Sequence, residues 1–329
     1  MKLRRWIYTF ALAVCTVAAM ALNGCASSPQ SQPTNGTATT GNQTTGGSNT
    51  TTNDTGKQTT GNQQGNGSSG TSTAPSGNKP PHKSAPKKLP LVELGNHSND
   101  ASYLNESLSV LGYLPVRFTP AHGVSTSTAE TAFSLTTTPL PGNYTWTYSS
   151  AANALSKLWQ PHTDNVITEG ALMRFQLDHH LSIDGVAGPQ VWTALQKALK
   201  AHEHTTAPYT YITVDESGTE TLRVWQNNQV VLQTPANTGI ASAPTSIGTW
   251  PIYLRYQSQE MRGTAPDGET YDDPGVPYVN YFHGGDAVHG FPRSQYGYPQ
   301  SLGCVEIPIS AAKTVYSLVN YGTLVSVRP

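Results

Sequence analysis

The stretch "YTYITVDESGTETLRVWQNNQVVLQTP" (residues 209–235) indicates the fold of its part of the chain, because apolar and polar side chains alternate along it. Alternation at every second position is the period of a strand with one buried face. Asn227-Asn228 interrupts the second alternating run and suits a two-residue hairpin turn. The same alternation returns in "TWPIYLRYQ" (249–257), so the pattern predicts a mostly β region.

The chain ends with "ISAAKTVYSLVNYGTLVSV" (309–327), which predicts one helix followed by a closing strand. Ser310 is the predicted N-cap of this helix, and Gly322 marks its end. We therefore expect residues 207–329 to form a mostly β domain with one C-terminal helix.

The preceding residues, 91–203, predict helices. "ASYLNESLSVLGYLP" (101–115) has leucines at helical spacing and a stop at Gly112. "NVITEGALMRFQLDHHLSIDGVAGPQVWTALQKAL" (165–199) predicts two more helices, with Thr168 as the N-cap of the first and Pro189 at the start of the second. We expect a small all-α bundle with a long insertion at about residues 117–160.

This helical block resembles the peptidoglycan-binding domain found on many wall enzymes. The matching residues are Leu111-Gly112-Tyr113, Phe175-Gln176, Leu181, Asp184-Gly185, Gly188 and Trp192-Thr193-Ala194-Leu195. Nearly all of them are typical of core or turn positions. The resemblance therefore predicts the fold of the block more firmly than it predicts binding.

The N-terminus predicts export. A basic start, "MKLRR", precedes an uncharged apolar run and then "LNGC" (22–25), which resembles the lipobox of bacterial lipoproteins. The resemblance implies a lipid on the sulfur of Cys25 and a membrane-anchored, extracytoplasmic protein that faces the cell wall, with residues 1–25 as signal peptide and lipobox. A plain secretory signal and an uncleaved anchor remain the alternatives.

Residues 27 to about 78 are almost entirely Ser, Thr, Gly, Asn and Gln, and "KPPHKSAPKKLP" (79–90) is a Pro- and Lys-containing hinge that completes the segment 26–90. Such a composition is too poor in apolar residues to form a core and predicts a disordered tether. Without Lys2, Arg4 and Arg5 of the signal, 16 basic residues stand against 20 acidic ones. We therefore expect no nucleic-acid partner.

Cys304 is the one cysteine outside the N-terminal segment, since the other two are Cys15 and Cys25. A lone cysteine can be a buried, inert residue. As a nucleophile it needs a base and donors for an oxyanion. His283 and His289 are the two candidate bases upstream, and Gly303 allows a tight turn in which nearby N–H groups converge on one oxygen.

The stretch around Cys304 resembles the L,D-transpeptidase family, whose motif is His-Gly, a spacer, and Ser/Thr-x-Gly-Cys followed by an apolar residue. His289-Gly290 and Ser301-Leu302-Gly303-Cys304-Val305 fill this motif, and "PANTGIASAPTSIGTWPI" (235–252) resembles an upstream strand and turn of the family. The resemblance implies a sandwich-like β fold over residues 207–329. It also implies a Cys–His site in which the carbonyl of Gly290 orients His289.

The reaction implied by the resemblance is acyl transfer without a cofactor or metal. Cys304 is the nucleophile and His289 the general base and acid, with backbone N–H groups near Gly303 as oxyanion donors and Ser301 as a further site residue. A stem tetrapeptide loses D-alanine, and an amine of a second stem peptide takes the acyl group to give a 3–3 cross-link. A zinc site at His179, His180, His202 and His204 is not expected, because no Cys or acidic ligand set accompanies them.

Glu306 and Leu302 depart from the residues common in the family. A carboxylate on the same side of a strand as Cys304 disfavours the thiolate. Glu306 either pairs with Arg293 or receives the ammonium of the acceptor, and the competing interpretation is a degraded site. His283, Arg293, Glu306 and Tyr298 are the predicted substrate contacts.

Three functions fit these patterns: a cross-linking L,D-transpeptidase, a carboxypeptidase or endopeptidase that uses the same cysteine and histidine, and a non-catalytic wall-binding lipoprotein. The first is the leading hypothesis because the full Cys–His motif is present.

Overall fold

The computed structural model describes residues 89–121 and 139–329. The predicted signal, the lipidation site Cys25 and the tether up to residue 88 lie outside the described residues. The described residues fall within one compact unit, Pro80–Pro329. None of the helices in the described ranges has the length and hydropathy needed to span a bilayer.

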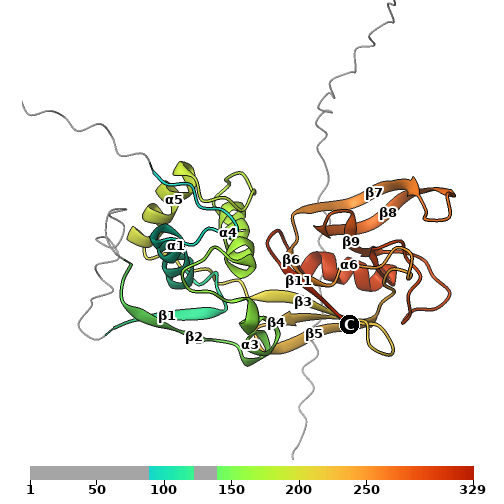
Figure 1. The fold of residues 1–329 in the computed structure, drawn as a ribbon, viewed down its shortest axis with the longest axis horizontal. Coiled ribbons are helices and arrows are strands. Elements are labelled where there is room, and N and C mark those ends of the chain that lie inside the picture. The colour runs from blue at the N-terminus through green and yellow to red at the C-terminus, as the bar shows by residue number, and fades with distance from the viewer. Residues whose placement is uncertain (1–88, 122–138) are drawn as a thin grey trace, which may run out of the picture. The chain divides into compact units, whose positions relative to one another are not determined.

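In the ranges that the structure describes, the helical block contains four α-helices, one short 3-10 helix and a two-stranded sheet; Figure 1 shows their arrangement. Its elements in chain order are α1 (Asn99–Val110), β1 (Val116–Pro120), β2 (Gly142–Trp146), α3 (Ser149–Leu155), η2 (Ser156–Leu158), α4 (Val166–Asp178) and α5 (Pro189–Lys200). The predicted helical bundle is confirmed. The antiparallel pair β1–β2 and helix α3 lie at the predicted insertion. They were not predicted, because its sequence shows neither the alternation of a strand nor the spacing of a helix.

Two predicted helix caps in the chain are wrong. Asn165, and not Thr168, caps α4, because its Oδ1 accepts from the N–H groups of Ile167 and Thr168. The Thr168 hydroxyl instead donates to Asn105 Oδ1 at 2.6 Å inside the block. At the C-terminal helix the cap position is Pro308, one residue before Ile309, so Ser310 lies inside the helix.

The β-rich region is built from two sheets and one helix, as predicted. One sheet has the strand order β5-β4-β3-β11-β6 and the other has β10-β9-β8-β7. The elements are β3 (Thr210–Asp215), β4 (Thr221–Gln226), β5 (Gln229–Pro235), β6 (Gly248–Pro251), β7 (Leu254–Thr264), β8 (Thr270–His283), β9 (Asp286–Gly290), β10 (Val305–Ile307), α6 (Ile309–Leu318) and β11 (Leu324–Arg328). The hairpin turn at Asn227-Asn228 is confirmed, and Asn227 takes the positive φ of 56° that such turns require.

One hydrophobic core joins the two sheets and α6. Ile212 and Val325 come from the five-stranded sheet, Val288 and Ile307 from the other, and Val315 from α6; all are completely buried. Burial of this apolar surface on both sheets favours the sandwich-like arrangement.

The core of the helical block extends into the β-rich region. Tyr211 of β3 and Leu324 of β11 are almost fully buried within the same cluster as the helices. Gly170 of α4 and Gly322 approach so closely that a Cβ on Gly322 would lie 2.0 Å from the Gly170 carbonyl oxygen. Only a glycine allows such a backbone contact.

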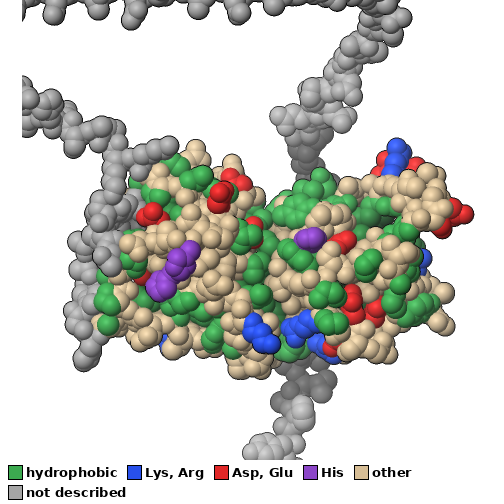
Figure 2. Space-filling view, in the orientation of Figure 1, with side chains coloured by type: hydrophobic (Ala, Val, Ile, Leu, Met, Phe, Trp, Pro, Cys, Tyr) green, Lys and Arg blue, Asp and Glu red, His purple; other side chains and the backbone are tan. Residues whose placement is uncertain are grey.

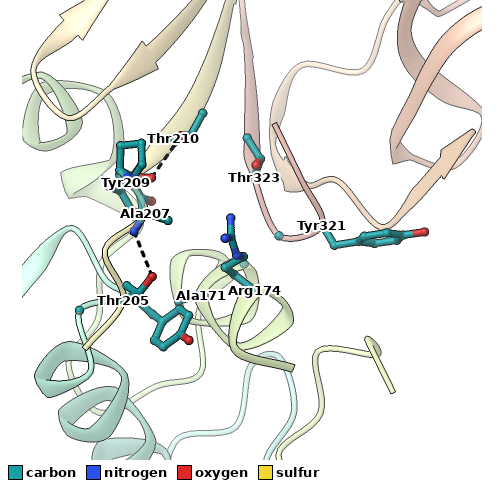
Figure 3. A pocket seen from close by; sticks show the side chains of 13 residues that line it. Ala171, Arg174, Thr205, Ala207, Tyr209, Thr210, Tyr321 and Thr323 are labelled. Carbon is teal, nitrogen blue, oxygen red and sulfur yellow. Dashed lines mark hydrogen bonds between the residues drawn. The ribbon is translucent and has the colours of Figure 1, made fainter. Parts of the chain in front are cut away.

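A small pocket lies beside this contact (Figure 3). Arg174 of α4 points into it from one side, Thr205 and Tyr209 of the connecting segment line a second side, and Tyr321 and Thr323 line a third. Its volume is about 50 Å³, close to that of one or two water molecules. The two regions therefore pack against each other with little empty space.

Candidate active site

His289 lies on β9, Cys304 directly precedes the neighbouring strand β10, and both residues line one cavity. Strands β9 and β10 run parallel, and Glu306 pairs with His289 in their register. Paired residues of neighbouring strands lie on the same face, so Glu306 and His289 point to one side of the sheet. Their neighbours along the chain, Val288 before His289 and Val305 after Cys304, point to the opposite face and lie in the core between the sheets.

The imidazole of His289 is buried and held in one orientation. Only 3% of the residue is exposed, and its Nδ1 lies 3.1 Å from the carbonyl oxygen of Gly290. Because a carbonyl oxygen can only accept, Nδ1 carries the proton of the neutral ring, and Nε2 is left as an acceptor. Burial lowers the pKa of His289, against a smaller opposite effect of its bond to Gly290.

Close packing explains why a glycine follows His289. A Cβ on Gly290 would lie 3.1 Å from the Cβ of Ala312 and 3.2 Å from the Cα of Ile309. Both of these residues belong to α6. A side chain at position 290 would therefore push this helix away from the strand that carries His289.

The thiol of Cys304 is neutral in the resting protein. Burial raises its pKa to about 12, Asp286 and Glu306 act in the same direction, and a hydrogen bond from the N–H of Ala287 acts against them. The sulfur lies 3.7 Å from the carbonyl oxygen of Gly285. Since the imidazole is neutral too, the site is not a preformed thiolate–imidazolium pair, and the thiol proton has to leave when a substrate is attacked.

The turn before Cys304 depends on Gly303. This residue has a φ of +117°, and a Cβ on it would lie 2.7 Å from Asp286 Oδ1. Its N–H donates to Ser301 Oγ at 3.2 Å, while the Ser301 hydroxyl donates to the Cys304 carbonyl at 2.5 Å. Ser301 therefore fixes the shape of the turn, and the N–H of Gly303 is already engaged.

The segment 237–240 supports this turn from the side. Asn237 exchanges two backbone hydrogen bonds with Glu306, and the N–H of Ile240 donates to the carbonyl of Ser301 at 2.9 Å. Glu220 anchors the segment, because its carboxylate accepts from the N–H and the hydroxyl of Thr238 at 2.6 and 2.7 Å. This is the strand and turn that the sequence motif at 235–252 marked.

Glu306 is paired with Arg293. Arg293 Nε and Nη2 donate to its two carboxylate oxygens at 2.7 and 2.8 Å, and the guanidinium lies over the ring of Phe291 at 4.7 Å. The first of the two arrangements expected for Glu306 is therefore the one in the structure. A bidentate pair of this kind holds the negative charge close to the arginine and away from the thiol.

A cavity of about 700 Å³ opens over these residues. Strands β9 and β10 and their loops contribute Gly285, Asp286, His289, Phe291, Arg293, Ser301, Leu302, Cys304 and Glu306, and the β7–β8 hairpin contributes Gln259, Glu260, Met261, Arg262, Tyr271, Asp273 and Tyr281. The volume suits a peptide-sized ligand. Two predicted contacts lie elsewhere: His283 packs on Trp250 with ring centroids 4.2 Å apart, and the half-exposed Tyr298 is absent from the lining.

The charged hairpin residues of the cavity were missed in the sequence analysis. Charged side chains of both signs gather at the tip of the β7–β8 hairpin (Figure 2), where Arg262 forms ion pairs with Glu260 and Asp272. These residues lie far from Cys304 along the chain and outside the cysteine–histidine motif, so no sequence pattern linked them to the site. Asp286, three residues before His289, was also missed; its Oδ2 accepts from the N–H of Ser246 at 3.0 Å.

Comparison with known proteins identifies two families along the chain. Residues 209–327 match the family model of the L,D-transpeptidase catalytic domain, and residues 163–195 match the model described as "Putative peptidoglycan binding domain". No curated protein matches the chain.

Solved structures of L,D-transpeptidases are similar to this chain. The catalytic domain of the E. faecium enzyme is 27% identical, with a TM-score of 0.34, over 38% of this chain and 100% of that domain. An enzyme from Mycobacterium smegmatis is 23% identical over 37% of this chain, with a TM-score of 0.34, and L,D-transpeptidase 3 from Mycobacterium tuberculosis is 21% identical over 37%, with a TM-score of 0.33. The matched region spans 59% and 62% of these two mycobacterial chains.

The chain therefore carries an L,D-transpeptidase catalytic domain at residues 209–327, preceded by a peptidoglycan-binding domain that includes residues 163–195.

Proposed function

We propose that the protein forms 3–3 cross-links in peptidoglycan by way of an acyl-enzyme on Cys304. The observation that carries the proposal is that Cys304 and His289 line the same cavity, beside the paired strands β9 and β10, with His289 Nδ1 bonded to the carbonyl oxygen of Gly290. This arrangement leaves Nε2 of His289 as the base for the thiol proton.

The acyl-donor step begins when Cys304 Sγ attacks the carbonyl carbon that links diaminopimelate to the terminal D-alanine of a stem tetrapeptide. The thiol proton passes to His289 Nε2, and the carbonyl oxygen becomes an oxyanion. Because the N–H of Gly303 is engaged with Ser301, we assign the oxyanion to the neighbouring N–H of Cys304. The intermediate collapses, the imidazolium protonates the leaving nitrogen, and D-alanine departs from a thioester.

The acceptor step is the attack of a side-chain amine of a second stem peptide on this thioester. His289 takes a proton from the amine, the new amide forms, and the thiol is regenerated. The charges of the cavity favour a cationic acceptor. Four carboxyl groups and two arginines line it; Glu260 pairs with Arg262 and Glu306 with Arg293, which leaves the carboxyl groups of Asp273 and Asp286 without an ion pair among the described residues.

The protein is further proposed to be tethered to the membrane through a lipid on Cys25. Residues 26–90 would then form the tether, 91–203 the wall-binding domain and 207–329 the catalytic domain.

Intact-mass analysis after incubation with a carbapenem tests the nucleophile. We expect one adduct on the wild type and none on Cys304→Ala. A non-catalytic wall-binding protein would give no adduct on either. Incubation with disaccharide-tetrapeptides then separates cross-linked dimer, the expected product, from the tripeptide that a carboxypeptidase would release.

A further inference from the structure

The helical block contains a second cavity, of about 420 Å³, that is distinct from the active site. Three aromatic side chains line it: Phe118 of β1, Tyr144 of β2 and Trp159, which follows η2. The ring centroids of Phe118 and Tyr144 are 5.1 Å apart, and those of Tyr144 and Trp159 are 5.2 Å apart. The two strands lie at the predicted insertion, outside the residues that match the peptidoglycan-binding model.

Glu106 of α1 brings a carboxyl group to the aromatic cavity. It is 7% exposed, and within residues 89–121 and 139–329 it has no ion pair with any basic side chain. The N–H of Leu140 donates to it, but burial dominates and raises the pKa of Glu106 to about 7. An unpaired buried carboxyl costs stability, and a ligand that hydrogen-bonds to it would recover part of that cost.

Two further polar groups face the same space. The hydroxyl of Tyr144 is buried and has no hydrogen-bond partner in the described part of the chain. The exposed His162 uses Nδ1 for a 2.9 Å bond with Ser102 Oγ, so its second ring nitrogen is directed elsewhere. The cavity thus combines aromatic faces with a carboxyl, a phenol and an imidazole.

This combination restricts the chemistry of a ligand. Aromatic faces pack against the apolar C–H face of a sugar ring, and a carboxyl and a phenol bond to hydroxyl and amide N–H groups. No Lys or Arg is among the lining residues, so phosphate and carboxylate groups have no partner there. A stem peptide, which carries carboxylates, is therefore a poor fit beside Glu106.

We propose that the aromatic cavity binds an N-acetylated sugar ring of the wall glycan, with Trp159 as the stacking residue and Glu106 as the hydrogen-bond acceptor. The proposal rests on the proposed function, since it supplies the glycan contact of a wall enzyme. All of the lining residues precede the peptidoglycan-binding match at residues 163–195, so the proposed site is additional to the matched part of the block.

Titration calorimetry tests the proposal. The protein without its predicted signal, residues 26–329, is titrated with chitotetraose, which is four linked N-acetylglucosamine units. We expect binding to the wild type and a dissociation constant at least tenfold higher for Trp159→Ala and for Glu106→Gln. Tyr144→Phe removes one hydroxyl with little risk to folding and should weaken binding several-fold. Cellotetraose, which lacks the N-acetyl groups, should bind more weakly than chitotetraose.

The matched control is Tyr256→Ala. Tyr256 is 40% exposed on β7 and lies in the lining of neither cavity, so this variant should bind chitotetraose as the wild type does. Wild type that does not bind chitotetraose at millimolar concentration, or equal binding by the three cavity variants, would overturn the proposal.

The carbapenem adduct on Cys304, measured on the same samples, separates the two proposals. An adduct without sugar binding refutes only the glycan site. Sugar binding without an adduct refutes the acyl-enzyme and leaves the glycan site standing. Thermal unfolding of each variant identifies any loss of binding that is due to misfolding.

Discussion

Glu306 in the catalytic domain and Glu106 in the helical block are buried to the same degree, 5% and 7% exposed, but their surroundings differ. Glu306 accepts hydrogen bonds from Nε and Nη2 of Arg293. Glu106 accepts only from a backbone N–H, and its pKa is raised. The catalytic cavity therefore compensates its buried charge internally, so that the thiol next to it is disturbed less. The aromatic cavity leaves its carboxyl available to a ligand.

Both glutamates belong to one compact unit. Substitutions in the core that the helical block shares with the β-rich region should therefore destabilise both sites together, which is the largest effect we expect. Leu324→Ala should lower the free energy of unfolding by about 2–5 kcal/mol, since Leu324 of β11 is buried in the core of the helices. We expect a single unfolding transition, shifted as a whole, in calorimetry. Leu94→Ala is the matched control, because Leu94 is 54% exposed and its removal should change stability by less than about 0.5 kcal/mol. Two separate transitions, of which only one moves, would contradict the shared core.

Arg293→Met makes Glu306 resemble Glu106. The variant leaves a buried carboxylate unpaired near Cys304, which raises the pKa of the thiol and slows carbapenem acylation, by about tenfold for each unit of pKa. Stability should fall by about 1–3 kcal/mol, less than for a fully buried pair because the Arg293 side chain is 30% exposed. Acylation is followed by mass spectrometry and stability by thermal unfolding.

Arg262→Met is the control for this variant. Arg262 lines the same cavity, but its side chain is 64% exposed, and exposed ion pairs contribute little. Equal effects of the two substitutions would show that the pairing of Glu306 does not matter.

Asp164→Asn tests a second buried carboxyl group of the helical block, which like Glu106 has a raised pKa. Asp164 is completely buried, both of its carboxylate oxygens lack a hydrogen-bond partner among the described residues, and burial raises its pKa to about 7. Above pH 7 the folded protein must hold this charge, whereas below about pH 4 the group is neutral in both states. Wild-type stability should therefore fall as the pH rises from 4 to 7.

The Asp164→Asn variant should lose this part of the pH dependence and be more stable than wild type at pH 8 by about 1–3 kcal/mol. Urea unfolding at pH 5 and pH 8 measures both effects. Asp267→Asn, at an exposed turn, should change neither value. A variant less stable than wild type at pH 8 would mean that the carboxylate has a favourable partner.

The smallest effect concerns the pH dependence of acylation. Burial lowers the pKa of His289 and raises that of Cys304 to about 12, so the base is deprotonated and the thiol is protonated across the neutral range. The rate of carbapenem acylation should vary little between pH 7 and 9, and because burial lowers the pKa of His289 it should fall only at a pH below the ordinary histidine pKa of about 6.5. A rate that rises tenfold between pH 7 and 9 would instead indicate a thiolate nucleophile with a lower pKa.

Much of this molecule could be predicted from local sequence. Period-two alternation and the Asn227-Asn228 turn predicted the strands, and helical spacing with Gly112 and Pro189 predicted helices, because such patterns report which face of an element is buried. The cap at Thr168 was wrong because the side-chain oxygen of Asn165 accepts from the first N–H groups of that helix. The cap at Ser310 was wrong because the last helix already begins at Ile309, after Pro308, which makes no side-chain cap. The site motif was readable because His289-Gly290 and Ser301 to Cys304 lie close together along the chain.

The sequence predicted a helical block, a mostly β domain with one helix, and, through its family resemblance, Cys304 and His289 as the candidate catalytic residues. The remaining lining of the two cavities became known only from the tertiary structure. The β7–β8 hairpin and Asp286 line the cavity around Cys304, and aromatic rings line the cavity around Glu106. The core that joins Leu324 to the helices was likewise visible only in the folded molecule. The physical reason is that periodicity records whether a side chain is buried, whereas its partners across the fold depend on how distant segments pack.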